Sequence, residues 1–368
     1  MTLFINGHFL QQKITGVQRC AIELIKELDE LCSSNDCIEI LCSNEPIINE
    51  INLKNIKIRK VGFLKKNLWG QITFPLYSLI KHADTLGIAN IESIFYPSFV
   101  FVHDQTDRNF PQSYSKKHLF VWHFIRFFSL KKAKKIFTVS NFSKSEILKF
   151  YPQLKQDKII VVYNSANHLK KITSDNNIDN ETIRTFLSEN KEFYLTVGSK
   201  IFHKNQKFIY KLATLHPEKN FIIVGGKSNS MRDMEDTDMM CPNIFYTGYI
   251  SDKELNNLYL HAKGFIFPSL YEGFGIPVLE AICLGTKTVA VSDILVFNEL
   301  FSKNVYKFDP YKAENFSFEK MNKSIISEDV RNWYCEKFSW KSSAKIIYDT
   351  IKKFGISDKT KKIKGKEL

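Results

Sequence analysis

The sequence predicts an α/β chain of two domains, each built on a parallel sheet covered by helices. Its 368 residues exceed one ordinary domain and fit two of about 150 to 200 residues. In residues 265–293 an apolar run ends at Pro268, a Gly-containing turn and a helical segment follow, and a β-branched run begins at Thr286. Strand, loop, helix and strand in this order form the repeating unit of a parallel sheet. Ligands bind at the carboxyl ends of such strands, so the loop after Pro268 is expected at a ligand site.

The chain is basic, with a net charge of +13. Nucleic acid, an anionic membrane surface and a phosphorylated substrate are the partners that such a charge allows. No zinc-finger, RNP or helix-turn-helix pattern is visible, so nucleic acid ranks last. The seven cysteines form no C-x-x-C pair, which indicates neither zinc nor a disulfide framework and suggests a reducing cytoplasm. The N-terminal sequence does not resemble a signal peptide, and no run of 18 apolar residues predicts a membrane span.

The N-terminal half begins with a predicted strand at residues 2–6. Gly16 then precedes a helical pattern to residue 31, so Gly16 is either an anion-binding glycine or a packing glycine at a helix start. Residues 38–42 and 56–61 read as strands and 69–83 as a helix. Residues 93–104 read as two short strands broken at Pro97 and ending in His103 and Asp104, where the histidine is either a polar anchor of the site or structural.

Residues 116–135 combine aromatic and basic side chains. Phe120, Phe124, Phe127 and Phe128 fall on one helical face, and lysines flank both ends. We expect the aromatic face to pack in a domain core, and the lysines are left open as a membrane-facing patch. The following helix is expected to open with the capping box of Ser143 and Glu146, and a later one with that of Ser251 and Glu254.

The second half begins with a strand at residues 193–197. After Gly198 come Ser199, Lys200, His203 and Lys204, and the cationic groups among them suit the phosphates of a ligand. Surface lysines on a loop are the simpler alternative. Residues 228–240 read as a surface excursion, and beyond Val291 the strand pattern fades.

Two glutamates stand in the central stretch, Glu272 in the loop and Glu280 in the helix. Between them, Gly273 and Gly275 expose backbone amides near a helix start, which suits a phosphate or diphosphate. A carboxylate suits paired sugar hydroxyls. Together these groups describe a nucleotide-sugar site, although a Gly-rich turn with two solvated glutamates fits the bare spacing as well.

The stretch TGYISDKELNNLYLHAKGFIFPSLYEGFGIPVLEAICLGTKTVAVS closely resembles the signature region of retaining glycosyltransferases of the family 4 type. The resemblance implies the GT-B fold, two Rossmann-like domains with a cleft between them. The implied boundaries are an acceptor-binding domain at 1–167, a connection at 168–192, a nucleotide-sugar domain at 193–335, a helix crossing back at 336–354 and a basic, disordered tail at 355–368.

The resemblance also assigns roles. Glu280 would bind the nucleotide ribose, Glu272 the donor hexose, and Lys204 with Gly16 the diphosphate, while His103 would lie near the anomeric carbon. His103, Glu272 and Lys204 are the expected catalytic residues. The expected donor-binding residues are Gly16, Ser199, Lys200, Phe274, Gly275, Ile276, Pro277, Val278 and Glu280. The chain departs from the family pattern at His203 and Ser199, where relatives carry arginines, so the part of Lys200 is in doubt.

The implied activity is transfer of a hexose, with GDP-mannose or a UDP-hexose as donor, to a glycan or lipid-linked acceptor of surface polysaccharide or lipopolysaccharide. No D-x-D motif appears in a plausible site loop, so no metal and no cofactor is expected. We expect a cytoplasmic chain, open to peripheral contact with the anionic inner face of the membrane and without a nucleic-acid partner. A GT-B sugar-nucleotide epimerase or hydrolase is the alternative, and a basic nucleic-acid-binding protein a remote one. The donor sugar, its base, the acceptor and the oligomeric state are not predicted.

Overall fold

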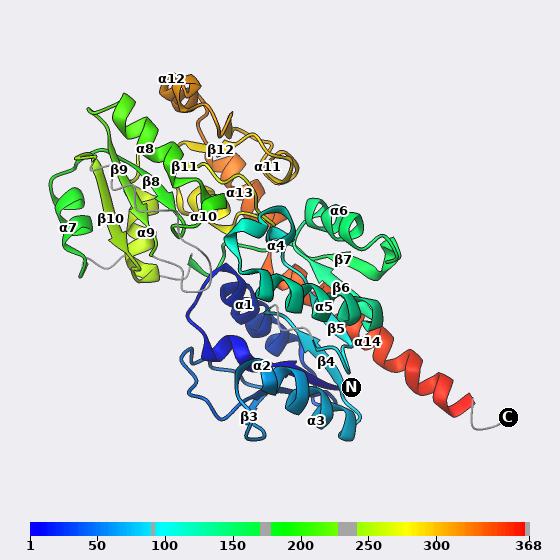
Figure 1. Ribbon diagram of the computed structural model, residues 1–368. Helices are drawn as coiled ribbons and strands as arrows, with labels where there is room; N and C mark the ends of the chain where they lie inside the picture. Colours follow the sequence, from blue (N-terminus) through cyan, green and yellow to red (C-terminus); the bar gives the residue numbers. More distant parts are fainter. Residues whose placement is uncertain (90–92, 170–177, 227–240, 365–368) are drawn as a thin grey trace. The chain divides into compact units, whose positions relative to one another are not determined.

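The computed structural model describes residues 1–89, 93–169, 178–226 and 241–364, with side chains as far as residue 354. It divides into two compact units (Figure 1). The first comprises residues 1–105, 117–164 and 340–368, and the second comprises 106–116 and 165–339. Residues 168–192, the expected connection, contain helix α7 (Glu181–Ser188) in their described part. Residues 228–240, the expected surface excursion, lie outside the described residues.

The first unit holds a parallel sheet of seven strands in the order β3-β2-β1-β4-β5-β6-β7. The strands are β1 (Thr2–Asn6), β2 (Cys37–Cys42), β3 (Lys57–Lys60), β4 (Asp84–Gly87), β5 (Phe99–Phe101), β6 (Lys135–Thr138) and β7 (Ile159–Val161). Its helical segments are η1 (Gly7–Gln11), α1 (Gly16–Leu31), α2 (Lys66–Leu68), η2 (Trp69–Thr73), α3 (Phe74–Ile80), α5 (Lys116–Lys132), α6 (Asn141–Phe150), η4 (Gln156–Lys158) and α14 (Trp340–Lys364).

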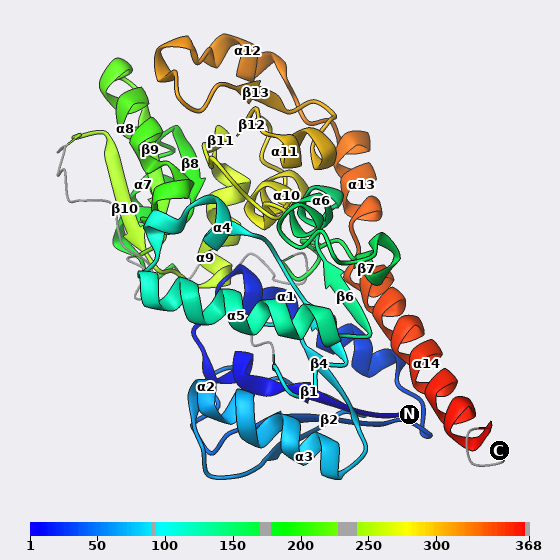
Figure 2. The ribbon, with the colours of Figure 1, turned by 45° about the vertical axis from the view of Figure 1, so that its right-hand side comes forward.

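The chain direction decides which face of this sheet each helix covers. The connection through α1 leads from β1 outward to β2, whereas those through α3 and α5 lead in the opposite sense, from β3 to β4 and from β5 to β6. Because such crossovers are right-handed, α3 and α5 share one face and α1 lies on the other. Helix α14 packs against α1, and Figure 2 shows α5 in front of α1.

The second unit holds a parallel sheet of six strands in the order β10-β9-β8-β11-β12-β13. The strands are β8 (Phe193–Val197), β9 (Asn220–Val224), β10 (Ile244–Gly248), β11 (Gly264–Phe267), β12 (Val289–Ser292) and β13 (Tyr306–Phe308). The remaining helical segments are α4 (Thr106–Asn109), η3 (Pro111–Ser113), η6 (Phe202–Lys204), α8 (Gln206–Leu215), α9 (Asp252–His261), α10 (Ile276–Leu284), α11 (Leu295–Leu300), η7 (Ala313–Asn315), α12 (Phe318–Lys323) and α13 (Glu328–Lys337).

Two parallel sheets with covering helices confirm the predicted fold class. The capping box of Ser251 and Glu254 opens α9 as predicted, with the Glu254 N–H donating to the Ser251 hydroxyl at 3.2 Å. The box predicted at Ser143 was wrong, because α6 begins one turn earlier and its N-cap is Ser140, which accepts the Ser143 N–H at 2.9 Å. The expected disordered tail was also wrong in part, since α14 continues to Lys364.

Two further expectations need correction. Cys283 of α10 and Cys335 of α13 form a disulfide, although their spacing in the sequence indicated none. The aromatic face of α5 is not in the core, because Phe120 and Phe124 are exposed. Within the described residues, no helix has the length and apolar character to cross a bilayer.

Candidate functional site

Two loops of the second unit emerge at the same edge of its sheet. Strand β8 ends at Val197 and is followed by residues 198–205, and β11 ends at Phe267 and is followed by residues 268–275. The two strands are parallel neighbours, so their carboxyl ends lie side by side, where open α/β sheets bind ligands.

Backbone and side-chain hydrogen bonds tie these loops together. The Leu270 N–H donates to the His203 carbonyl at 2.7 Å. The Asn205 amide donates to the carbonyls of Pro268 at 3.1 Å and Pro310 at 2.9 Å. Asn205 has φ 52°, in the left-handed region that asparagine tolerates better than most residues. This residue therefore ends η6 and fixes its position against the loop after β11.

The result is an ion pair between Lys204 and Glu272. The Lys204 ammonium lies 2.5 Å from the Glu272 carboxylate, and their side chains are 19% and 13% exposed. The ammonium also lies 5.4 Å from the centroid of the Phe267 ring. Lys204 and Glu272 are 68 positions apart in the sequence and were predicted separately as site residues, and the structure brings them together.

Glycines allow the loop after β8 to pack tightly against the turn after β9. Gly225 has φ +134°, and a Cβ there would lie 2.3 Å from the Gly198 carbonyl oxygen. The Gln206 amide also donates to that oxygen, at 3.0 Å. Ser199 and Lys200 follow in this loop and are half-buried, and the Lys200 N–H donates to the Gly226 carbonyl at 3.4 Å.

His203, which stands where the family pattern has an arginine, is buried. Burial, and then the neighbouring Lys204 charge, lower the pKa of His203 to about 3. Its ring packs against Phe110, with the ring centroids 5.9 Å apart. A histidine that is neutral at pH 7 supplies no positive charge for a phosphate, so the cationic side chains of this loop are Lys200 and Lys204.

Helix α10 begins at the second loop. Its N-cap Gly275 has φ +93°, and a Cβ there would lie 2.8 Å from the Phe297 ring. The side chains of Phe274, Ile276 and Val278 point into the core, so this segment can offer only backbone groups to a ligand. The Val278 N–H is already used, because it donates to the Gly275 carbonyl at 3.0 Å, and Pro277 has no backbone N–H. The Ile276 N–H lies in the first turn of the helix, where backbone N–H groups have no intrahelical partner.

Glu280 lies in the second turn of α10 and is buried. Its carboxylate accepts a hydrogen bond from the Tyr259 hydroxyl at 2.9 Å and lies 3.2 Å from His168 Nε2. Burial, and then the Glu280 charge, raise the pKa of Tyr259. Each carboxylate oxygen can accept a second hydrogen bond, so Glu280 is held in place while keeping acceptor capacity.

The two other predicted residues belong to the first unit. Gly16 is exposed at the first position of α1. His103 follows β5 and is buried; its Nε2 lies 2.8 Å from the Ile88 carbonyl oxygen, and its ring stacks on Phe101 at 4.6 Å. Burial lowers the pKa of His103. A neutral ring that donates from Nε2 leaves Nδ1 as an acceptor.

Sequence reasoning missed the residues that hold the site. Asn205, His168 and Tyr259 position Lys204 or Glu280, and the only available signal was the asparagine directly after Lys204. Within the described residues, no three His, Cys, Asp or Glu side chains come together as metal ligands would.

The sequence is similar to those of known mannosyltransferases. The chain is 31% identical over 215 residues to the O-antigen chain mannosyltransferase RfbU of Salmonella typhimurium, covering 57% of this chain and 56% of that protein. It is 26% identical over 246 residues to the serotype-specific mannosyltransferase WbdA of Escherichia coli, covering 60% and 29%. The chain thus spans about half or less of the length of these relatives.

Solved structures show the fold. A crystal structure of Anabaena Alr3699/HepE in complex with UDP and glucose matches with a TM-score of 0.66 at 14% identity, covering 95% of this chain and 98% of that one. Sucrose-phosphate synthase from Thermosynechococcus elongatus matches with a TM-score of 0.73 at 12% identity, covering 96% and 99%. The family described as glycosyl transferases group 1 matches residues 177–347. Residues 177–347 are thus similar to the glycosyl transferases group 1 family, and the fold of the chain is that of the GT-B glycosyltransferases.

Proposed function

We propose that the chain transfers a hexose from a nucleotide-sugar to a hydroxyl of a glycan or lipid-linked acceptor, with retention at the anomeric carbon. The acceptor would be a precursor of surface polysaccharide or lipopolysaccharide. GDP-mannose is the first donor to test, because the relatives RfbU and WbdA are both named mannosyltransferases; UDP-hexoses come next. The proposed setting is the cytoplasm, at the inner face of the membrane.

The observation that carries the proposal is the pairing of Lys204 with Glu272 beside the start of α10. A cation, a carboxylate and backbone N–H groups then stand at one sheet edge, which matches the diphosphate and the hydroxyls of one nucleotide-sugar. Glu280, in the same helix, would accept from the ribose hydroxyls.

In the proposed reaction, the bond between the anomeric carbon and the diphosphate oxygen breaks. The acceptor oxygen then bonds to the same face of that carbon, and the acceptor proton leaves with the nucleoside diphosphate. Lys204 would stabilise the charge that develops on the departing diphosphate. Glu272 would hold sugar hydroxyls, and His103, Gly16, Ser199 and Lys200 keep their predicted roles toward the sugar and the phosphates. We further propose that no metal is needed.

The test begins with a thermal-shift screen of the full chain against GDP, UDP, dTDP and ADP sugars. A ligand that binds only the folded form raises the melting temperature by mass action. The stabilising donor is then incubated with and without lipid-linked or glycan acceptors. Sugar transfer that requires an acceptor supports the proposal, whereas equal release or isomerisation of the sugar without acceptor would identify a hydrolase or epimerase.

A further inference from the structure

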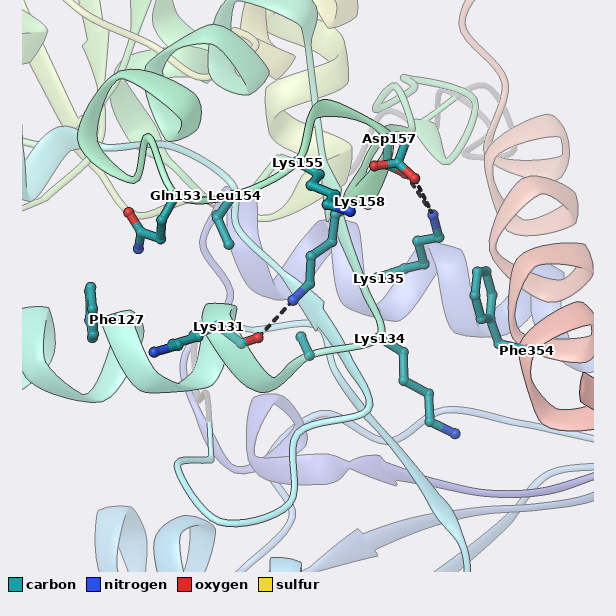
Figure 3. A pocket seen from close by; sticks show the side chains of 11 residues that line it. Phe127, Lys131, Lys134, Lys135, Gln153, Leu154, Lys155, Asp157, Lys158 and Phe354 are labelled. Carbon is teal, nitrogen blue, oxygen red and sulfur yellow. Dashed lines mark hydrogen bonds and ion pairs between the residues drawn. The ribbon is translucent and has the colours of Figure 1, made fainter. Parts of the chain in front are cut away.

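A lysine-rich pocket lies in the first unit at the carboxyl end of α5 (Figure 3). Its volume is about 730 Å³. Five lysines line it, Lys131, Lys134, Lys135, Lys155 and Lys158, against one carboxylate, that of Asp157. None of these residues belongs to the donor site described above.

The positive charge of this pocket is only weakly compensated. The Lys135 ammonium donates to the Asp157 carbonyl at 2.6 Å, but the Asp157 carboxylate lies 4.0 Å away and is 80% exposed. Lys158 reaches across the pocket and donates to the Lys131 carbonyl at 2.9 Å (Figure 3). Burial, and then the charge of Lys135, lower the pKa of Lys158. The charge of Lys135 therefore disfavours the charged form of Lys158, and an anion bound in the pocket would offset this repulsion.

Lys131 and Lys155 add two exposed charges at the pocket. In the described part of the chain neither makes an ion pair. Lys134 is different, since its ammonium donates to the Asp84 carboxylate at 2.7 Å. An ammonium is a compact charge that binds phosphate without the planar geometry of a guanidinium, so the pocket suits a phosphate group.

The pocket continues into an exposed aromatic stripe on α5. Phe120, Phe124 and Phe127 are four and three residues apart and lie on one helical face. Their exposed fractions are 75%, 53% and 37%, and Phe127 also lines the pocket. Exposed aromatic rings beside ammonium groups are typical of a surface that lies in the interfacial region of a bilayer.

A second apolar stripe lies on the same face of the sheet. Leu76, Leu79 and Ile80 of α3 are exposed, and Lys81 follows the helix. Ile94 joins the two regions, because its carbonyl accepts from the Lys132 ammonium of α5 at 3.0 Å and its N–H donates to Gln71 of η2 at 3.2 Å. The two stripes therefore lie on helices that cover the same face of the sheet, with Ile94 between them.

We propose that this face docks on an anionic phospholipid bilayer, with Phe120 and Phe124 in the interfacial layer and the lysine pocket holding a lipid phosphate. The inference deepens the proposed function, since a lipid-linked acceptor would lie in such a bilayer. The phosphate in the pocket would belong to a lipid, and neither to a soluble anion nor to a nucleic acid.

The test is partitioning of the full chain onto vesicles of phosphatidylcholine, with and without phosphatidylglycerol. We expect binding that requires phosphatidylglycerol and weakens with salt. Each basic residue near an anionic surface contributes about a fivefold factor. The Lys131→Gln/Lys155→Gln variant should therefore bind about thirtyfold more weakly. A matched control, Lys211→Gln/Lys341→Gln, removes two exposed charges outside the pocket and should retain most of the binding.

A Phe120→Ser/Phe124→Ser variant keeps every charge and should also lose vesicle binding, by at least tenfold. Equal binding to both vesicle types, or unchanged binding of the pocket variant, would overturn the proposal. It would equally fail if inorganic phosphate or DNA bound in a Lys131-dependent manner while vesicles did not. Thermal shift by a nucleotide-sugar, measured on the same variants, reports the donor site separately, so its failure is distinguishable from failure of the docking surface.

Discussion

Replacing Lys204 by alanine is the most direct perturbation of the proposed chemistry. The side chain is 19% exposed and its ammonium is directed at Glu272, so a donor diphosphate bound there would be partly shielded from water. At about 4 Å and an effective dielectric constant of about 20, two unit charges interact with about 4 kcal/mol. Loss of one comparable electrostatic group in other enzymes costs about 10² to 10³ in kcat. We expect a decrease of that size for Lys204→Ala.

The assay is kcat at saturating donor, because weaker donor binding alone would appear in KM. Lys207→Ala is the matched control, since Lys207 is exposed on α8 three residues later and should leave kcat within about twofold. Circular dichroism and a melting curve establish that each variant is folded. A folded Lys204→Ala variant with wild-type kcat at saturating donor would refute the role of Lys204 in leaving-group stabilisation.

Three other perturbations have defined outcomes. Asn205→Ala removes two hydrogen bonds and strains a left-handed residue, so its free energy of unfolding should fall by about 2 to 3 kcal/mol; Asn205→Gly, which tolerates φ 52°, should lose less. His203 has a pKa of about 3 in the folded chain. Between about pH 6.5 and 3 this histidine therefore binds a proton only in the unfolded chain. The free energy of unfolding should fall by about 1.4 kcal/mol per pH unit as the pH drops through that range. His203→Leu should remove this slope in urea unfolding measured at pH 7 and pH 5, and an unchanged slope would contradict the buried neutral state. Tyr259→Phe removes one hydrogen bond from Glu280 and should raise KM for the donor about fivefold with little change in kcat; the opposite pattern would argue against a ribose-binding Glu280.

The sequence predicted the regular parts of the fold because apolar periodicity and turn residues report burial directly. Strand β1 and helix α1 match the predicted ranges closely. Prediction from the sequence failed where strands are short or polar. Strand β4, with the sequence DTLG, and β13, with YKF, carry no run of β-branched residues, and sheet pairing alone makes them strands. The prediction that the aromatic face of α5 packs in a core was wrong for another reason. An aromatic stripe has the same spacing in the sequence whether a core or another partner covers it.

The candidate site was predictable only as separate motifs. Glu272 and Lys204 could be selected by their loops, but their contact spans 68 residues and depends on β8 and β11 being neighbours in the sheet. Asn205 reaches a carbonyl 105 residues away, and Tyr259 reaches Glu280 across two helices. Residues such as Asn205 and Tyr259, which hold a site residue in place, have no recognisable local sequence pattern, since any polar side chain of suitable length could occupy their positions.

The ion pair itself allows the structural and catalytic roles of Lys204 to be separated. Both side chains are largely buried, and removal of Lys204 alone leaves the Glu272 carboxylate without this partner, which should destabilise the fold by about 1 to 3 kcal/mol. The double variant Lys204→Ala/Glu272→Gln removes the uncompensated charge, so we expect most of the unfolding free energy to return. Sugar transfer should not return with it, because neither the cation for the diphosphate nor the carboxylate for the sugar is present. Recovery of both stability and kcat would mean that Lys204 only balances the charge of Glu272 and takes no part in transfer.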